Sequence, residues 1–169
     1  MKIALLGTGF GQAHAAVYAQ RPDVDEVVVF GRAPEKLAKI SEQFGFATTT
    51  DLDAVITDPS VDLVDICLPT RLHAEIAVRA MQAGKDVLIE LPLAVTLNDA
   101  HRIIAVQQAT SRRAFVDIFS RFRGRSQWPG RCRFWSGQHG TRPAIIGFPR
   151  GETPHLGDEP DPGRYLVPG

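Results

Sequence analysis

Long hydrophobic runs are missing from this chain of 169 residues. Its apolar stretches, such as residues 27–30 and 114–116, are far shorter than the roughly 18–20 residues that a bilayer crossing requires. Met1 leads directly into the strand-like segment KIALLG, without the charged region, longer apolar core and cleavage site of a signal peptide. We therefore expect no membrane association and a cytoplasmic location.

Cysteine is scarce, since the chain has only Cys67, in an apolar strand pattern, and Cys132, in a stretch rich in Gly and Arg. Two cysteines fit a reducing compartment better than a disulfide framework. His139 and His155 are too isolated to form a metal site with Cys132. We expect no bound metal.

An excess charge of either sign is also missing, but the zero net charge conceals a division of the chain after Phe122. Residues 1–122 carry 12 Lys+Arg against 15 Asp+Glu, or −3, and residues 123–169 carry 7 against 4, or +3. Gly and Pro make up 11 of the first 122 residues and 16 of the last 47. Such a composition without a repeat is typical of low-complexity sequence, so we expect a folded domain over 1–122 and a poorly ordered tail over 123–169.

The tail has an alternative interpretation as a nucleic-acid-binding segment. Its seven arginines alternate with aromatic residues that could stack on single-stranded bases. Four acidic residues and seven prolines accompany them, and a net charge of +3 makes a weak electrostatic footprint. We therefore do not expect a nucleic-acid partner.

Apolar runs of strand length alternate with segments of helical period through residues 1–122. The expected helices cover residues 12–21, 33–45, 51–57, 71–84 and 100–109, with Pro34 in a first turn, Gly45 after a last turn, and Asp51 and Thr96 as N-caps. The expected strands cover residues 2–7, 25–32, 46–50, 61–69, 86–90 and 113–119. This alternation predicts an α/β fold, a doubly wound Rossmann sheet of six parallel strands in the order 3-2-1-4-5-6.

The motif GTGFGQ joins the first expected strand to the first helix. Glycines at such a turn allow it to be tight and let the backbone approach a pyrophosphate at the helix N-terminus. The third glycine of G-x-G-x-x-G would fall at Gln12, whereas this chain has it one residue earlier. A tight turn without a ligand is the alternative, but the position between strand and helix favours a cofactor site made of Gly7, Thr8, Gly9, Phe10 and Gly11.

The end of the second strand, about 20 residues further on, normally carries an acid that binds the ribose hydroxyls of NAD. This chain has Gly31 and Arg32 there. A guanidinium can pair with a 2′-phosphate and stack on adenine, so the sequence favours NADP over NAD as cofactor. A solvated surface arginine is the alternative.

Several separated motifs in order resemble the glucose-fructose oxidoreductase and inositol dehydrogenase family (Gfo/Idh/MocA): the GTGFG turn, CLPTRLH, AGKDVLIELPLA and the closing SRF at residues 120–122. The resemblance implies a Rossmann domain followed by a sheet domain for substrate, with hydride passing between nicotinamide and a sugar or polyol carbon. It also implies that the nicotinamide half of the cofactor is bordered by Leu68, Pro69, Thr70, His73, Glu90 and Leu91.

The chain departs from this family in two places. Family members commonly have Glu-Lys-Pro where this chain has Glu90, Leu91 and Pro92, and leucine cannot transfer a proton. The family pattern is also lost after Phe122, as in a truncated or frame-shifted product. We therefore assign no catalytic residue, and a nucleotide-binding module without catalysis is the alternative to an active oxidoreductase.

Three further expectations concern the rest of the chain. An unrelated Rossmann protein such as a methyltransferase is disfavoured, since residues 31 and 32 offer no acid for a ribose. His14 is expected on a polar or partly covered helix face, with a position facing a cofactor or substrate as the alternative, and His101 is expected on the surface near a helix start. Cys67 is expected to behave as a small hydrophobe. A sheet edge without its substrate domain would expose apolar surface, which carries a risk of aggregation or of pairing into a homo-oligomer.

Overall fold

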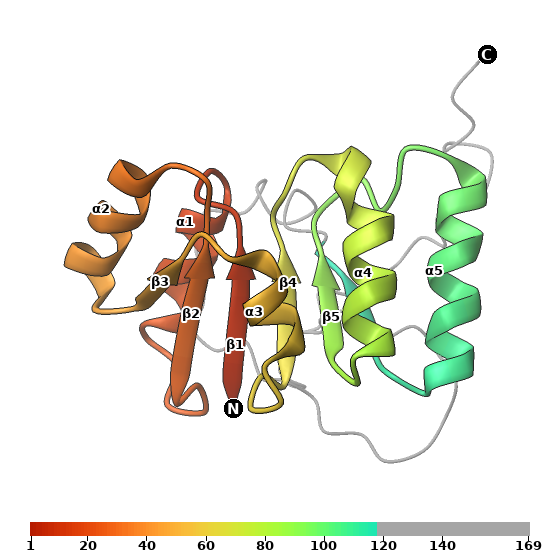
Figure 1. Cartoon of the computed structure of the whole chain (residues 1–169), viewed down its shortest axis with the longest axis horizontal. Coiled ribbons are helices and arrows are strands. Elements are labelled where there is room, and N and C mark those ends of the chain that lie inside the picture. The colour runs from red at the N-terminus through yellow and green to blue at the C-terminus, as the bar shows by residue number, and fades with distance from the viewer. Residues whose placement is uncertain (118–169) are drawn as a thin grey trace, which may run out of the picture.

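A computed structural model describes residues 1–117 of the chain. Its six strands form one parallel sheet in the order β3-β2-β1-β4-β5-β6 (Figure 1). The strands are β1 (Lys2–Leu6), β2 (Glu26–Phe30), β3 (Ala47–Thr49), β4 (Leu63–Ile66), β5 (Asp86–Ile89) and β6 (Ala114–Val116). The predicted six-stranded Rossmann sheet and its strand order are confirmed.

Helices cover both faces of the sheet. They are α1 (Gly11–Tyr18), α2 (Pro34–Phe44), α3 (Leu52–Thr57), α4 (His73–Gln82) and α5 (Leu97–Thr110), with a single 3-10 turn η1 (Thr70–Leu72) before α4. One core contains side chains of α1 and α2, and the other contains side chains of α3, α4 and α5. Figure 1 shows α3 and α4 in front of the sheet, α1 behind it, and α5 beside α4 at the β6 end.

The central strand β1 explains why the sheet needs two covered faces. Residues 3–6 are all fully buried, and alternate side chains belong to opposite cores: Ile3 and Leu5 to one, Ala4 and Leu6 to the other. A continuous apolar run is typical of a parallel strand covered on both sides. The sequence pattern KIALL therefore places β1 at the centre of the sheet.

The helix boundaries follow the capping residues of the sequence. The Asp51 carboxylate accepts the Ala54 N–H at 3.0 Å, and Gly45 ends α2 in the left-handed region at φ 73°. The Thr96 hydroxyl accepts the Asp99 N–H at 3.1 Å and donates to the Asp99 carboxylate at 2.8 Å. An aspartate therefore takes the position that glutamate or glutamine usually holds in a capping box, and these predicted caps are confirmed.

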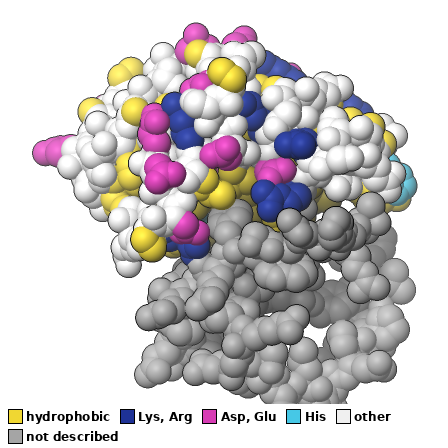
Figure 2. Space-filling model, turned by 90° about the horizontal axis from the view of Figure 1, so that it is seen from below, with side chains coloured by type: hydrophobic (Ala, Val, Ile, Leu, Met, Phe, Trp, Pro, Cys, Tyr) yellow, Lys and Arg dark blue, Asp and Glu magenta, His cyan; other side chains and the backbone are white. Residues whose placement is uncertain are grey.

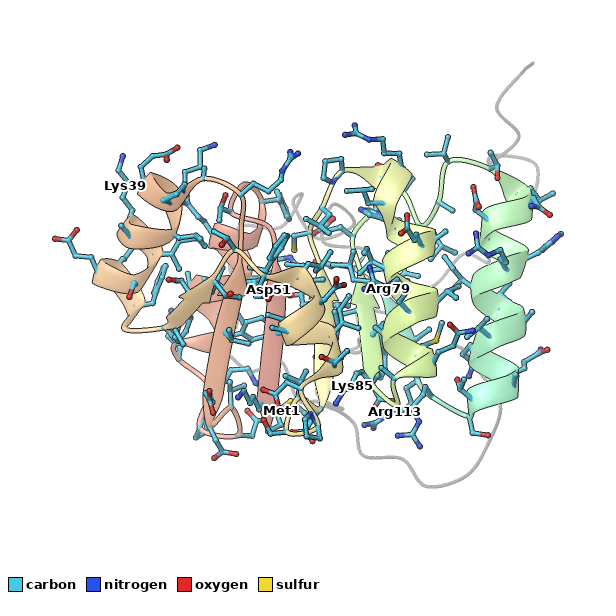
Figure 3. The ribbon with its side chains drawn as sticks, in the orientation of Figure 1. Met1, Lys39, Asp51, Arg79, Lys85 and Arg113 are labelled. Carbon is cyan, nitrogen blue, oxygen red and sulfur yellow. The ribbon has the colours of Figure 1, made fainter. Side chains whose placement is uncertain are left out.

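The two edges of the sheet differ in character. Figure 3 shows Met1, Lys85 and Arg113 at the lower edge, where the strands begin, and Figure 2 shows acidic and basic side chains adjacent to one another over that surface. Lys2 Nζ lies 3.0 Å from carboxylates of both Glu26 and Asp58. Solvent-screened surface pairs of this kind add little to stability. In open α/β sheets ligands bind at the opposite, carboxyl edge, and the candidate site lies there.

Part of what the sequence predicts falls outside the described residues. This concerns the domain boundary at residue 122, the tail over 123–169, the last residues of the sixth strand, and Cys132, His139 and His155. No helix within residues 1–117 is both long enough and apolar enough to cross a membrane.

Candidate functional site

The glycine turn between β1 and α1 lies against the end of β4. Gly7 has a φ of 119°, and a Cβ on it would lie 2.5 Å from the Cys67 carbonyl oxygen. Its N–H donates to the Phe30 carbonyl at 2.9 Å. Both the positive φ and the close backbone approach require glycine at this position, so the turn brings the ends of β1, β2 and β4 together.

The next part of the turn is open. A Cβ on Gly9 would meet no atom within 4 Å, and Phe10 is 50% exposed. Gln12, at the position of the third glycine in the usual fingerprint, is exposed in the first turn of α1. Open backbone at a helix N-terminus fits the approach of a pyrophosphate, so the residues present can accommodate a dinucleotide there.

Gly31 and Arg32 follow β2 and lie beside this turn. A Cβ on Gly31 would lie 2.5 Å from Thr8 Cγ2 and 3.0 Å from Leu37 Cδ2. Gly31 therefore lets Thr8 pack against the chain after β2. Arg32 is exposed, and within residues 1–117 its guanidinium has neither an ion pair nor a hydrogen bond. This geometry leaves a cation available where the ribose-binding acid of NAD enzymes would stand.

The residues after β4 form a loop that His73 ties to the residues after β5. Leu68 is half-buried, Pro69 is exposed, and Thr70 begins η1. His73 is 1% exposed, and its Nε2 and Nδ1 lie 2.7 Å from the Leu68 carbonyl and 3.0 Å from the Pro92 carbonyl. His73 thus holds the two loops together from inside, and its direct contact with a cofactor stays a prediction.

Glu90 and Leu91 follow β5 in the second of these loops. The Leu91 N–H donates to Glu90 Oε2 at 3.0 Å, and the Leu91 side chain is 45% exposed. The Leu91–Pro92 peptide bond is cis. Leu91 therefore presents an apolar side chain that cannot transfer a proton, at the position where the resemblance described above implies a lysine.

Beside Glu90 lies a group of polar side chains that we call the His14 cluster: His14, Tyr18, Asp65, Cys67, Glu90 and Asp117. His14 Nδ1 donates to Asp65 Oδ2 at 2.6 Å, and the Tyr18 hydroxyl donates to the same oxygen at 2.6 Å. His14 Nε2 lies 3.0 Å from Glu90 Oε1 and 3.2 Å from Asp117 Oδ2. Cys67 Sγ lies 3.5 Å from Asp65 Oδ1. One imidazole thus bridges three carboxylates, one within β4 and two directly after β5 and β6.

The cluster forms because of strand register and helix spacing. Ile66, Ile89 and Val116 are register partners, so the residues that follow them, Cys67, Glu90 and Asp117, form a row at the carboxyl edge. Asp65 lies two residues before Cys67, on the same face of the sheet. His14 and Tyr18 are four residues apart on α1, which places both side chains over that face.

The protonation states follow from burial and charge. Burial opposes a charge on His14, but the hydrogen bonds to Asp117 and Asp65 outweigh it and hold the pKa of His14 well above its ordinary 6.5. Burial and then the Asp117 charge raise the pKa of Glu90. Burial raises the pKa of the Cys67 thiol to about 12. The cluster therefore contains an imidazolium at His14 and a neutral thiol at Cys67. Its carboxylates compete for hydrogen bonds from the imidazolium.

Metal-ligating atoms come together in this cluster, because ligand atoms of His14, Cys67 and Glu90 all lie within 4.8 Å of one another. A metal needs a neutral imidazole and a thiolate. Here both nitrogens of His14 already bond carboxylates, and the raised pKa of Cys67 favours the thiol. The arrangement is that of a hydrogen-bonded ion cluster.

The sequence interpretation of His14 is corrected by the structure. His14 is 9% exposed and lies on the covered face of α1, not on a polar or half-covered one, because its partners come from three strands that are distant in sequence. Cys67 is half-buried, as expected of a small hydrophobe, yet it also contacts His14 at 3.6 Å. The signal that could have predicted the cluster is an acid within each of three apolar strand patterns: Asp65, Glu90 and Asp117.

Fold and site together define a dinucleotide-binding α/β protein: a sheet in the order 3-2-1-4-5-6 with a glycine turn at the switch point. The chain belongs to the GFO_IDH_MocA family, described as an oxidoreductase family with an NAD-binding Rossmann fold, whose model matches residues 1–118. The predicted family is thereby confirmed.

Individual relatives are enzymes that are longer than this chain. A 4-carboxy-2-hydroxymuconate-6-semialdehyde dehydrogenase of a Sphingobium species is 35% identical over 130 residues, 76% of this chain and 41% of the relative. Levoglucosan dehydrogenase of Pseudarthrobacter phenanthrenivorans is 39% identical over 107 residues, 57% of this chain and 27% of the relative. The chain thus spans about two fifths of the length of the first relative and about a quarter of the length of the second.

Two solved structures resemble the fold of this chain. Biliverdin reductase from Synechocystis in complex with biliverdin and NADP+ superposes with a TM-score of 0.66 at 30% identity, covering 70% of this chain and 38% of that one. Levoglucosan dehydrogenase in complex with NADH and levoglucosan gives 0.64 at 32% identity, covering 69% and 34%. These relatives bind NADP+ in one case and NADH in the other.

Proposed function

We propose that this chain is the cofactor-binding part of an NADP-dependent oxidoreductase that passes hydride between nicotinamide and a sugar or polyol carbon. The observation that carries the choice of NADP is Arg32, exposed after β2 at the place where an NAD enzyme has an acid. The structures of two relatives hold NADP+ in one case and NADH in the other, so Arg32 is the residue of this chain that favours NADP.

The residues present divide between the two halves of such a cofactor. The turn at Gly7, Thr8, Gly9, Phe10 and Gly11 would hold the pyrophosphate, and Gly31 and Arg32 the phosphorylated ribose of the adenosine half. The loops after β4 and β5 would border the nicotinamide half through Leu68, Pro69, Thr70, Glu90 and Leu91. Bound nicotinamide would supply the hydride acceptor or donor; these residues bind and orient it.

The proposed substrate is a small sugar or polyol. A relative named for levoglucosan supports a small sugar-like substrate. Substrate contacts would come from a second domain beyond the proposed binding domain over residues 1–122. A cytoplasmic, reducing location and self-association remain part of the proposal, on the composition arguments given above.

A second candidate function is a nucleotide-binding module without catalysis. Leu91 favours it, since an exposed leucine stands where a proton-transferring lysine is common in the family, and positioned acid or base groups contribute about 10²–10⁴ in rate. Following nicotinamide absorbance with a panel of sugars and polyols separates the two candidates. Oxidation of any of them supports the enzyme, and binding without turnover supports the module.

The cofactor assignment is tested by calorimetric titration of the full chain with NADP+ and NAD+. Arg32→Ala removes a charge-assisted bond worth about 1.5–3 kcal/mol, so the NADP+ affinity should fall about 10- to 100-fold while the NAD+ affinity stays nearly constant. Arg102→Ala is the matched control, because it removes the same charge from α5 at the opposite end of the sheet. Equal losses for NADP+ and NAD+ in Arg32→Ala would contradict the assignment.

A further inference from the structure

The His14 cluster lies on the half of the sheet edge that would face nicotinamide. A Rossmann sheet binds a dinucleotide across the switch point between its two mononucleotide-binding halves. Here Gly31 and Arg32 follow β2 in one half, and the row of Cys67, Glu90 and Asp117 follows β4, β5 and β6 in the other. The cluster therefore belongs to the half opposite the adenosine side.

Glu90 is the member of the cluster through which its charge reaches this edge. Asp65 is fully buried, whereas the Glu90 and Asp117 side chains are 16% and 19% exposed. Glu90 follows β5, which lies nearer than β6 to the switch point between β1 and β4, and His14 Nε2 holds its carboxylate at 3.0 Å. His14 in turn is fixed by Asp65, and Asp65 by the Tyr18 hydroxyl. Glu90 is thus held in position at the end of β5 by a chain of three hydrogen bonds.

The cluster carries an excess of negative charge. Asp65 and Glu90 share one imidazolium, so these three groups sum to −1 when both carboxyls are ionised. Asp117 bonds the same imidazole nitrogen as Glu90 and adds a further carboxylate. The excess of −1 holds even when Asp117 is left out of the sum.

The oxidised and reduced forms of the cofactor differ at one end only. The oxidised nicotinamide ring carries a charge of +1 and the reduced ring is neutral, while the phosphates and the adenosine half are the same in both. A fixed negative charge near the ring acts on this difference, and two unit charges several ångström apart at a partly wet site interact strongly enough to change affinity by on the order of tenfold.

We propose that the His14 cluster, acting through Glu90, sets the redox-state preference of this site and favours the oxidised cofactor. This inference rests on the proposed function. His14, Tyr18, Asp65 and Asp117 are positioning residues in it, and Glu90 is the partly exposed carboxylate on the strand nearer the switch point.

The preference should depend on pH, with a sign set by Glu90. The groups that face Glu90 are His14 from α1, Cys67 from β4 and Asp117 from β6. Burial and Asp117 raise the pKa of Glu90 above its usual value, so lowering the pH protonates it before ordinary surface carboxyls. As the pH rises, Glu90 ionises and the cluster becomes more negative. The affinity for the oxidised cofactor therefore increases relative to the affinity for the reduced one.

The test measures dissociation constants of NADP+ and NADPH for the full chain between pH 5 and 8. The ratio Kd(NADPH)/Kd(NADP+) should rise about three- to tenfold over this range in the wild type. In Glu90→Gln the ratio should be lower and independent of pH. Glu42→Gln makes the same change on an exposed residue near the end of α2 and should behave as the wild type.

The outcomes separate this inference from the proposed function. If the wild type binds both forms with a ratio that does not change with pH, the inference is overturned and the proposed function stands. If Glu90→Gln binds both forms with the wild-type pH dependence, the inference is likewise overturned. If the wild type binds neither form, the proposed function itself fails. The wild-type pH series needs no variant, so a poorly folded Glu90→Gln does not decide the result.

Discussion

The most demanding prediction concerns Asp65→Asn, which changes one atom in the buried part of the His14 cluster. Asp65 is 0% exposed and accepts hydrogen bonds from both His14 Nδ1 and the Tyr18 hydroxyl. Asparagine has nearly the same shape and keeps an acceptor oxygen. The substitution therefore removes the negative charge while leaving the packing of α1 on the sheet in place.

The expected loss in the free energy of unfolding follows from the His14 charge that remains buried without Asp65. Removing one partner of a buried ion pair typically costs about 3–5 kcal/mol, because the remaining charge is uncompensated. Here His14 keeps its contacts with Glu90 and Asp117, so we expect the free energy of unfolding at pH 7 to fall by about 3 kcal/mol, the lower end of that range. The control is Asp53→Asn, which loses an exposed ion pair with Arg79 and should cost less than about 1 kcal/mol.

Urea unfolding followed by far-ultraviolet circular dichroism measures this difference. A loss in Asp65→Asn no larger than that in Asp53→Asn would refute the reasoning, because it would mean that His14 and Asp65 are not a buried ion pair in the folded protein.

Two further predictions concern pH and the glycine turns. The pKa of His14 is raised in the folded state, so the stability that protonated His14 contributes is fully present below about pH 6.5. Above that pH the free energy of unfolding should fall by up to about 1.4 kcal/mol per pH unit. Urea midpoints should show that His14→Gln loses this dependence on pH and that the exposed His101→Gln keeps it. Gly31→Ala should lower the free energy of unfolding by about 1–3 kcal/mol, because its Cβ would meet Thr8 at 2.5 Å. Gly9→Ala should leave stability unchanged and weaken only NADP+ binding in calorimetry, since its Cβ has no neighbour within 4 Å; equal stability losses in the two glycine variants would contradict this assignment.

The fold could be predicted from the sequence because each of its determinants is local. The apolar run at residues 2–6 marks a central strand, and Asp51, Gly45 and Thr96 mark helix ends within a few residues of the atoms they bond. The glycine turn after β1 is equally local. Patterns of this kind depend on chain periodicity and on near neighbours, which a single sequence displays directly.

The His14 cluster could not be predicted in the same way, because its members meet only through the register of the sheet. Asp65 and Glu90 come from different strands, and His14 is separated from them by 51 and 76 positions. A histidine on an Ala-rich helix, taken alone, is ordinary. Once β4, β5 and β6 are aligned, Glu90 and Asp117 lie side by side after β5 and β6, and Asp65 lies on the same face of β4. His14 then bonds all three carboxylates.

Cofactor binding and catalysis are separable in this chain, and the residues at 90 and 91 show why. Glu90 is held by His14 and belongs to a charged cluster at the sheet edge, whereas its neighbour Leu91 can neither give nor take a proton. The groups proposed to bind NADP lie within residues 1–117, whereas position 91, where the family resemblance implies a lysine, is a leucine. A positive result for binding therefore carries no implication for turnover, and each must be measured by itself.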